Sequence, residues 1–212
     1  MAAGTAKDMR PPYGTGARAA RKRPVSDFEF LFALFGLLLG LSLAEVLGGL
    51  ARAIDARLRP GAAARLGWLT PLLGTFVLID LISFWGAAWV SREAIAVSSD
   101  SLLLVMAFAG AYFLAASLVF PRQIDAATDF DAHYLRVRRM VMGVLLVLLA
   151  CQMTWYASVP AIAARLVAPV SLGATVILAV LMVLAMLVRS ERWSRIVLLA
   201  LVARYLILIV IL

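Results

Sequence analysis

The chain has 212 residues, of which 64% are apolar and 15% are charged, and its formal net charge is +8. Together with a mean hydropathy of +0.99, this composition excludes an ordinary soluble domain and indicates an integral membrane protein. The positive charge does not indicate nucleic-acid binding, since no motif for it is present. Most Lys and Arg residues flank apolar segments, so we expect the lipid bilayer, with anionic lipid at the basic loops, as the main partner.

Long apolar segments organise most of the sequence. Residues 1–27 are rich in Gly, Ala, Pro, Lys and Arg and predict a disordered basic tail. Residues 28–212 contain apolar segments of about 20 residues, which is the length that crosses a bilayer as a helix. They predict an all-α polytopic membrane bundle with about six transmembrane helices, at 28–51, 67–90, 101–121, 139–159, 169–189 and 195–212. The alternative is five spans with a buried or interfacial final helix.

The loops between these segments alternate in charge. Arginines concentrate in the first, third and fifth loops, which predicts three hairpins whose connecting loops share the cytoplasmic side. The basic tail predicts the opposite orientation, so the sequence leaves the orientation open. We expect a cell membrane of the bacterial inner-membrane type. Trp68, Trp89 and Trp193 fall near segment ends and predict interfacial anchors.

Three ionisable residues lie inside the apolar segments, namely Glu45, Asp80 and Arg204. A charge there costs on the order of 2.5 to 3.5 kcal/mol even on lenient insertion scales, so each needs a partner or a task. At a rise of about 1.5 Å per residue, their depths from the same side fall within about 10 Å of one another. We therefore expect one cluster, either as a static ion pair that fixes helix pairing or as a proton or cation site. A third alternative is that Glu45 or Arg204 extends to a water layer.

Polar side chains on neighbouring segments extend this predicted site. Ser83 lies about one helical turn from Asp80, and Tyr112, Gln152 and Thr154 fall within the third and fourth segments. We expect these four to line the same interior, with ordinary helix-to-helix hydrogen bonding as the alternative.

The first segment also carries a strip of small residues, Gly36, Gly40, Ala44 and Gly48, at a spacing of four. Such a strip lets helix backbones approach closely. It predicts either packing within the chain or the seam of a homo-oligomer.

No enzyme signature is present, and neither catalysis, a cofactor nor a metal site is expected. In the third loop, Asp125, Asp129, Asp131 and His133 resemble a divalent-ion site only loosely. We expect instead that Asp131 caps the fourth helix near the positive end of its dipole. Cys151 is the single cysteine, so no disulfide forms within one chain.

These observations predict a channel-like or carrier-like protein that moves protons or small cations. Asp80 is the expected leading titrating group, Glu45 the second and Arg204 their counter-ion. The alternative function is a non-transporting membrane subunit or scaffold, in which the same buried ion pairs fix helix packing.

Overall fold

The computed structural model describes residues 27–58, 67–90, 98–125, 128–166 and 168–211. Its elements are all helices. They are α1 (Asp27–Leu58), α2 (Leu69–Val90), α3 (Ser99–Val119), α4 (Phe130–Ser158), α5 (Pro160–Leu166), α6 (Pro169–Leu187) and α7 (Glu191–Ile211). The predicted disordered tail lies outside the described residues, except for Asp27, which begins α1.

The five helices α1, α2, α3, α4 and α6 are each long and apolar enough to cross a membrane. This finding supports the predicted helical bundle of a multi-pass membrane protein. The short helix α5 had no counterpart among the predicted segments. It forms because Pro160 cannot continue α4 and instead starts a new helix, after Val159 in an extended conformation.

Two helices extend well beyond their predicted segments. The segment predicted at 28–51 continues to Leu58, and the one predicted at 139–159 begins at Phe130. Hydropathy falls at these ends because arginines appear there, but the helices continue as amphipathic turns. Ala53, Phe130 and Tyr134 in these turns are fully buried, so tertiary packing sustains the helices outside the apolar segments.

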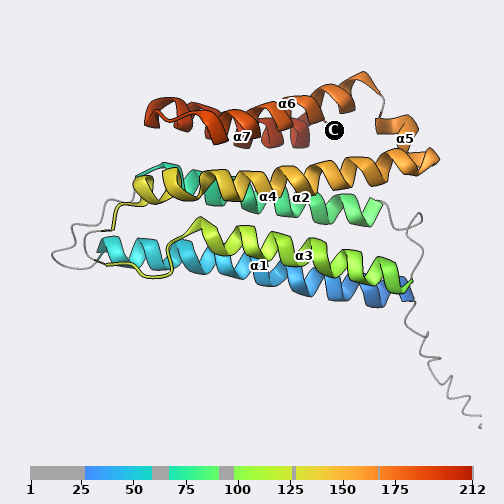
Figure 1. Ribbon diagram of the computed structural model, residues 1–212, viewed down its shortest axis with the longest axis horizontal. Coiled ribbons are helices and arrows are strands. Elements are labelled where there is room, and N and C mark those ends of the chain that lie inside the picture. Colours follow the sequence, from blue (N-terminus) through green and yellow to red (C-terminus); the bar gives the residue numbers. More distant parts are fainter. Residues whose placement is uncertain (1–26, 59–66, 91–97, 126–127, 167, 212) are drawn as a thin grey trace, which may run out of the picture.

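The helices lie side by side in three layers, with α1 and α3 in one outer layer, α2 and α4 in the middle, and α6 and α7 in the other outer layer (Figure 1). The most extensive contacts join α1 to α3, α2 to α7 and α3 to α4. Two of these three contacts join helices that are not consecutive in the chain. The middle helix α2 therefore has α1 and α7 on opposite sides.

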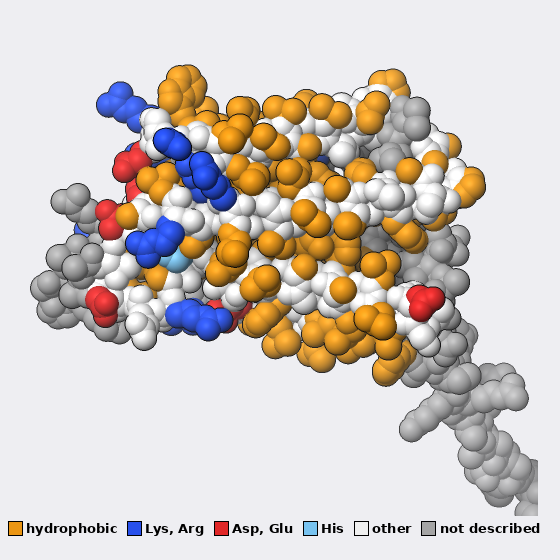
Figure 2. All heavy atoms as spheres, in the orientation of Figure 1, with side chains coloured by type: hydrophobic (Ala, Val, Ile, Leu, Met, Phe, Trp, Pro, Cys, Tyr) orange, Lys and Arg blue, Asp and Glu red, His pale blue; other side chains and the backbone are white. Residues whose placement is uncertain are grey.

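On the face shown in Figure 2, most charged side chains gather at one end of the bundle, where α1, α3 and α6 end and α2, α4 and α7 begin, while apolar side chains are spread over the rest of that face. We call this the charged end. Trp68 and Trp193 lie near it, and Trp89 lies at the far end of α2; all three are more than half exposed. Along the helix Trp68 and Trp89 are separated by about 30 Å, the thickness of a bilayer's hydrocarbon core.

The glycine of α1 that has the closest side-chain neighbour is not in the predicted strip. A Cβ atom built on Gly49 would lie 2.6 Å from the ring of Phe120, whereas one built on Gly40 would meet nothing within 4 Å. Ala44 is exposed as well. The strip therefore faces out of the bundle around Gly40 and Ala44, and the prediction that it packs within the chain is wrong for these two residues.

Replacing Gly49 with alanine should destabilise the bundle, since the added methyl group overlaps Phe120. We expect a loss of about 1 to 3 kcal/mol in unfolding free energy, as for other overpacked cores. Gly40→Ala is the matched control and should be neutral or slightly stabilising, because alanine favours the helix and the space is open. Reversible unfolding in mixed detergent micelles measures both; equal stability of the two variants would contradict the packing described.

Candidate functional site

Asp80 lies near the middle of α2 and forms hydrogen bonds to two other helices. Tyr112 of α3 donates its hydroxyl to one carboxylate oxygen at 2.8 Å, and Tyr205 of α7 donates to the other. Both tyrosines are almost fully buried, at 4% and 7% exposure. A phenol in an apolar setting needs a polar partner, and a carboxylate there needs donors, so each group satisfies the other.

Arg204 lies beside this group without pairing directly with Asp80. Its Nε donates to the carbonyl oxygen of Ala174 on α6 at 3.0 Å, and its guanidinium carbon lies 4.8 Å from the centre of the Tyr205 ring. Within the described part of the chain no ion pair of 4.0 Å or less joins Arg204 to Asp80. The predicted contact between Arg204 and Asp80 is therefore absent from the described residues. Instead, Tyr205 contacts both groups: its hydroxyl donates to Asp80, and its ring lies against the guanidinium of Arg204.

Arg204 also retains unused hydrogen-bonding capacity. Its Nη1 atom is buried and has no hydrogen-bond partner among the described residues. An unpartnered buried donor is costly, so it is available to a group that enters the site.

A cavity of about 630 Å³ reaches both charges. Side chains from α2, α3, α4, α6 and α7 line it; besides Asp80 and Arg204 they include Ser83, Tyr112, Gln152, Thr175 and Tyr205. Most of the other lining residues are apolar, among them Leu145, Leu149, Leu178 and Met182. A volume of this size, mainly apolar with a few polar groups, is typical of a small-ligand site.

The structure thus brings together most, but not all, of the predicted site. Ser83, Tyr112 and Gln152 line the cavity, and Gln152 donates to the hydroxyl of Tyr156 at 3.0 Å. Thr154 does not line it: its side chain is exposed and its hydroxyl donates to the carbonyl of Ala150 on its own helix.

Glu45 lies elsewhere, so the predicted three-charge cluster does not form. Its carboxylate pairs with Arg52 on the same helix, at 3.5 Å, and lines a separate cavity. The reason is the layering: α1 packs mainly on α3, and α2 separates it from α7, which carries Arg204. The seven-residue spacing of Glu45 and Arg52, about two helical turns, could have predicted this pair.

Sequence reasoning also missed Tyr205, the second donor to Asp80. It follows Arg204 directly and is the one tyrosine in α7. A polar aromatic group in an apolar span was the available signal, but the rotation of α7 about its axis was needed to place it.

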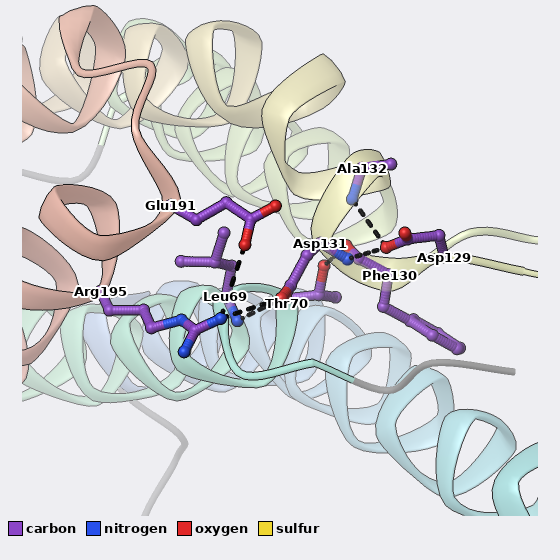
Figure 3. Close-up of polar contacts among 8 residues, drawn as sticks. All are labelled: Leu69, Thr70, Asp129, Phe130, Asp131, Ala132, Glu191 and Arg195. Carbon is purple, nitrogen blue, oxygen red and sulfur yellow. Dashed lines mark hydrogen bonds and ion pairs between the residues drawn. The ribbon is translucent and has the colours of Figure 1, made fainter.

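A second polar assembly joins α2, α4 and α7 at the charged end (Figure 3). Asp129, not Asp131, caps α4 by accepting hydrogen bonds from the backbone N–H groups of Asp131 and Ala132, at 2.9 and 3.0 Å. Asp131 instead accepts the backbone N–H of Leu69 at 2.9 Å, at the start of α2. Its other oxygen lies 3.7 Å from Arg195 of α7. The prediction that Asp131 caps α4 is therefore wrong, because its carboxylate serves the neighbouring helix.

The turn before α2 is shaped for this contact. Gly67 has a φ of +58°, and a Cβ atom built there would collide with the carboxylate of Asp131. Thr70 adds a hydrogen bond to the carbonyl of Phe130. Both carboxylate oxygens of Asp131 are engaged by the protein itself, which indicates a structural junction.

The third-loop residues that resembled a metal site serve these and similar contacts. A ring nitrogen of His133 lies 3.2 Å from the carbonyl oxygen of Leu118. Across the described ranges, no group of three or more His, Cys, Asp or Glu side chains is arranged to hold a metal ion. No protein-family model, curated protein or solved structure matches this chain.

Asp131→Ala should destabilise the bundle by about 1 to 3 kcal/mol, because it leaves the buried N–H of Leu69 without its acceptor and removes one of the two carboxylates that pair with Arg195. Asp125→Ala removes the same charge from an exposed position at the same end and should change stability by less than about 0.5 kcal/mol. Thermal unfolding in detergent compares the two. A cost shared equally by both variants would show that net charge, rather than the junction, determines the effect.

Proposed function

We propose that this protein is a channel-like or carrier-like membrane protein that moves protons or small cations past Asp80. The supporting observation is the cavity of about 630 Å³ that reaches this carboxylate at the middle of a membrane-spanning helix. Intramembrane carboxylates that face a cavity commonly mark ion and proton pathways. The lining includes α2 residues from Ile79 to Ala87, so it extends from Asp80 towards the end of α2 opposite the charged end.

We further propose that α7 is a sixth span and that the spans form three hairpins, α1–α2, α3–α4 and α6–α7. At 21 residues, α7 is about 31 Å long. Its charges Glu191, Arg192 and Arg195 lie in its first turns at the charged end, which leaves Arg204 as the one charge deeper in the helix. A cell membrane of the bacterial inner-membrane type remains the expected location.

Protonation of Asp80 would change the contacts that join three helices. The ionised carboxylate accepts from both tyrosine hydroxyls, one on each oxygen. Once protonated, the carboxyl group has a proton to donate, so one tyrosine must change from donor to acceptor or move away. Uptake of a proton is therefore coupled to the contact of α2 with α3 or α7. A carrier needs such a contact, because it must alternate between two conformations.

The alternative function is a non-transporting membrane subunit. The observation in its favour is that Asp80, Tyr112 and Tyr205 join α2, α3 and α7 whether or not anything passes. Buried polar groups of this kind can specify helix pairing. Under this alternative the outward strip around Gly40 and Ala44 would be a natural contact for a partner or a second copy.

Flux into liposomes tests the proposal. Asp80→Asn should abolish pH-driven uptake of protons or monovalent cations, because the amide cannot exchange a proton. Its oxygen still accepts a hydrogen bond from one tyrosine, and its NH2 group donates to the other, whose hydroxyl then acts as the acceptor. Asp100→Asn, which changes an exposed acid in the first turn of α3, is the matched control and should retain wild-type flux.

The tyrosine variants separate the two functions. If wild-type protein leaves liposomes tight while Tyr112→Phe and Tyr205→Phe both lower the unfolding free energy, the subunit function is correct. If wild-type flux survives in Asp80→Asn, the pathway through Asp80 is excluded.

A further inference from the structure

A second cavity, of about 350 Å³, lies between α1 and α3, apart from the Asp80 cavity. We call it the α1–α3 groove. Its lining consists of Glu45, Arg52, Phe113, Ser117 and Arg122. The proposed pathway through Asp80 uses none of these residues.

The groove spans the boundary between headgroups and hydrocarbon. Arg52 lies in the last turns of α1 and Arg122 follows the end of α3, so both belong to the charged end. Deeper along the same helices, Phe113 is 42% exposed and Leu41, one turn before Glu45, is 50% exposed. Exposed apolar side chains at that depth face lipid tails. The groove is therefore polar at the headgroup level and continuous with an apolar, lipid-facing surface below it.

The charges of the groove sum to one positive charge. Glu45 neutralises Arg52 at 3.5 Å, and a Cβ atom built on Gly48 would lie 3.5 Å from Nη1 of Arg52, so the guanidinium lies close to the bare backbone of Gly48. Arg122 has no ion-pair partner of 4.0 Å or less among the residues that the structure describes. Two arginine side chains thus face one cavity that contains a single carboxylate.

Ser117 does not change this balance. Its side chain is buried at 8% exposure and its hydroxyl donates to the carbonyl of Leu114 at 2.9 Å. The donors left to a ligand therefore belong to the two arginines.

We propose that the α1–α3 groove binds the phosphate group of one membrane phospholipid, with Arg52 and Arg122 contacting the phosphate oxygens and an acyl chain lying along Phe113 and Leu41. A phosphodiester carries one negative charge, which matches the charge of the groove. Guanidinium groups are well suited to phosphate because they present several donors in a plane. A lipid phosphate is favoured over a free one, because the polar part of the groove lies at headgroup depth and opens onto the lipid-facing surface.

Native mass spectrometry of the detergent-purified full chain, titrated with phosphatidylglycerol, tests the proposal. We expect wild-type protein to retain one lipid and the double variant Arg52→Gln/Arg122→Gln to bind it at least about tenfold more weakly, since contacts to charged groups are of that strength. The matched control is Arg136→Gln/Arg139→Gln, which removes the same charge from exposed positions at the same end and outside the groove. It should bind as wild type does.

Two further binding measurements identify the ligand. A diacylglycerol with the same acyl chains lacks the phosphate and should not be retained. Competition by millimolar inorganic phosphate would show that the site takes the free anion and would overturn the lipid assignment. Equal weakening in both double variants, or no retained lipid on the wild type, would overturn the site itself. Because Arg122 is exposed and pairs with no acid among the described residues, the single variant Arg122→Gln should fold normally and still show weaker binding.

Discussion

The hydrogen bonds that bring two tyrosine hydroxyls to the carboxylate of Asp80 are the constraint on which the middle of this bundle depends. A carboxylate at mid-span is costly in hydrocarbon, so its donors must arrive at the same depth and from the correct faces of their helices. Tyr112 and Tyr205 satisfy this requirement, which fixes the rotation of α3 and α7 relative to α2. The cavity beside Asp80 exists within that arrangement.

The polar assembly around Asp131 and the one around Asp80 differ in whether a cavity lies beside them. At the charged end, Asp131 is engaged by Leu69 and Arg195, and Gly67 leaves room for its carboxylate and nothing more. Near Asp80, by contrast, a cavity of about 630 Å³ remains, and both Asp80 and Arg204 line it. A satisfied junction stabilises a fold, whereas a cavity with unused polar groups can bind or conduct. This contrast is why we assign function to the assembly around Asp80.

Hydropathy alone predicted the long apolar helices closely, because the bilayer sets their length. The polar residues inside these segments predicted one interior for Asp80, Arg204, Ser83, Tyr112 and Gln152, which line one cavity, and for Thr154, which does not. The sequence could not predict which helices lie side by side, so Glu45 was placed in the wrong group. Some contacts depend on how each helix is rotated about its axis, such as Gly49 against Phe120 and Tyr205 on Asp80. A helix that is apolar on every face has no hydrophobic periodicity from which this rotation could be predicted. The amphipathic turns beyond the apolar segments were missed because they are held by packing.

The central claim is that Asp80 faces a pathway. The most direct test is to measure whether the aqueous phase reaches the cavity. In a Cys151→Ala background, Ser83→Cys places a thiol in the cavity lining, and Val147→Cys places one on α4 at a position that is 61% exposed on the outer surface of the bundle. A charged, membrane-impermeant thiol reagent applied to reconstituted protein should modify the cysteine at position 83 and spare the one at position 147. Failure to modify position 83, with modification recovered in detergent, would show a dry site and contradict the account.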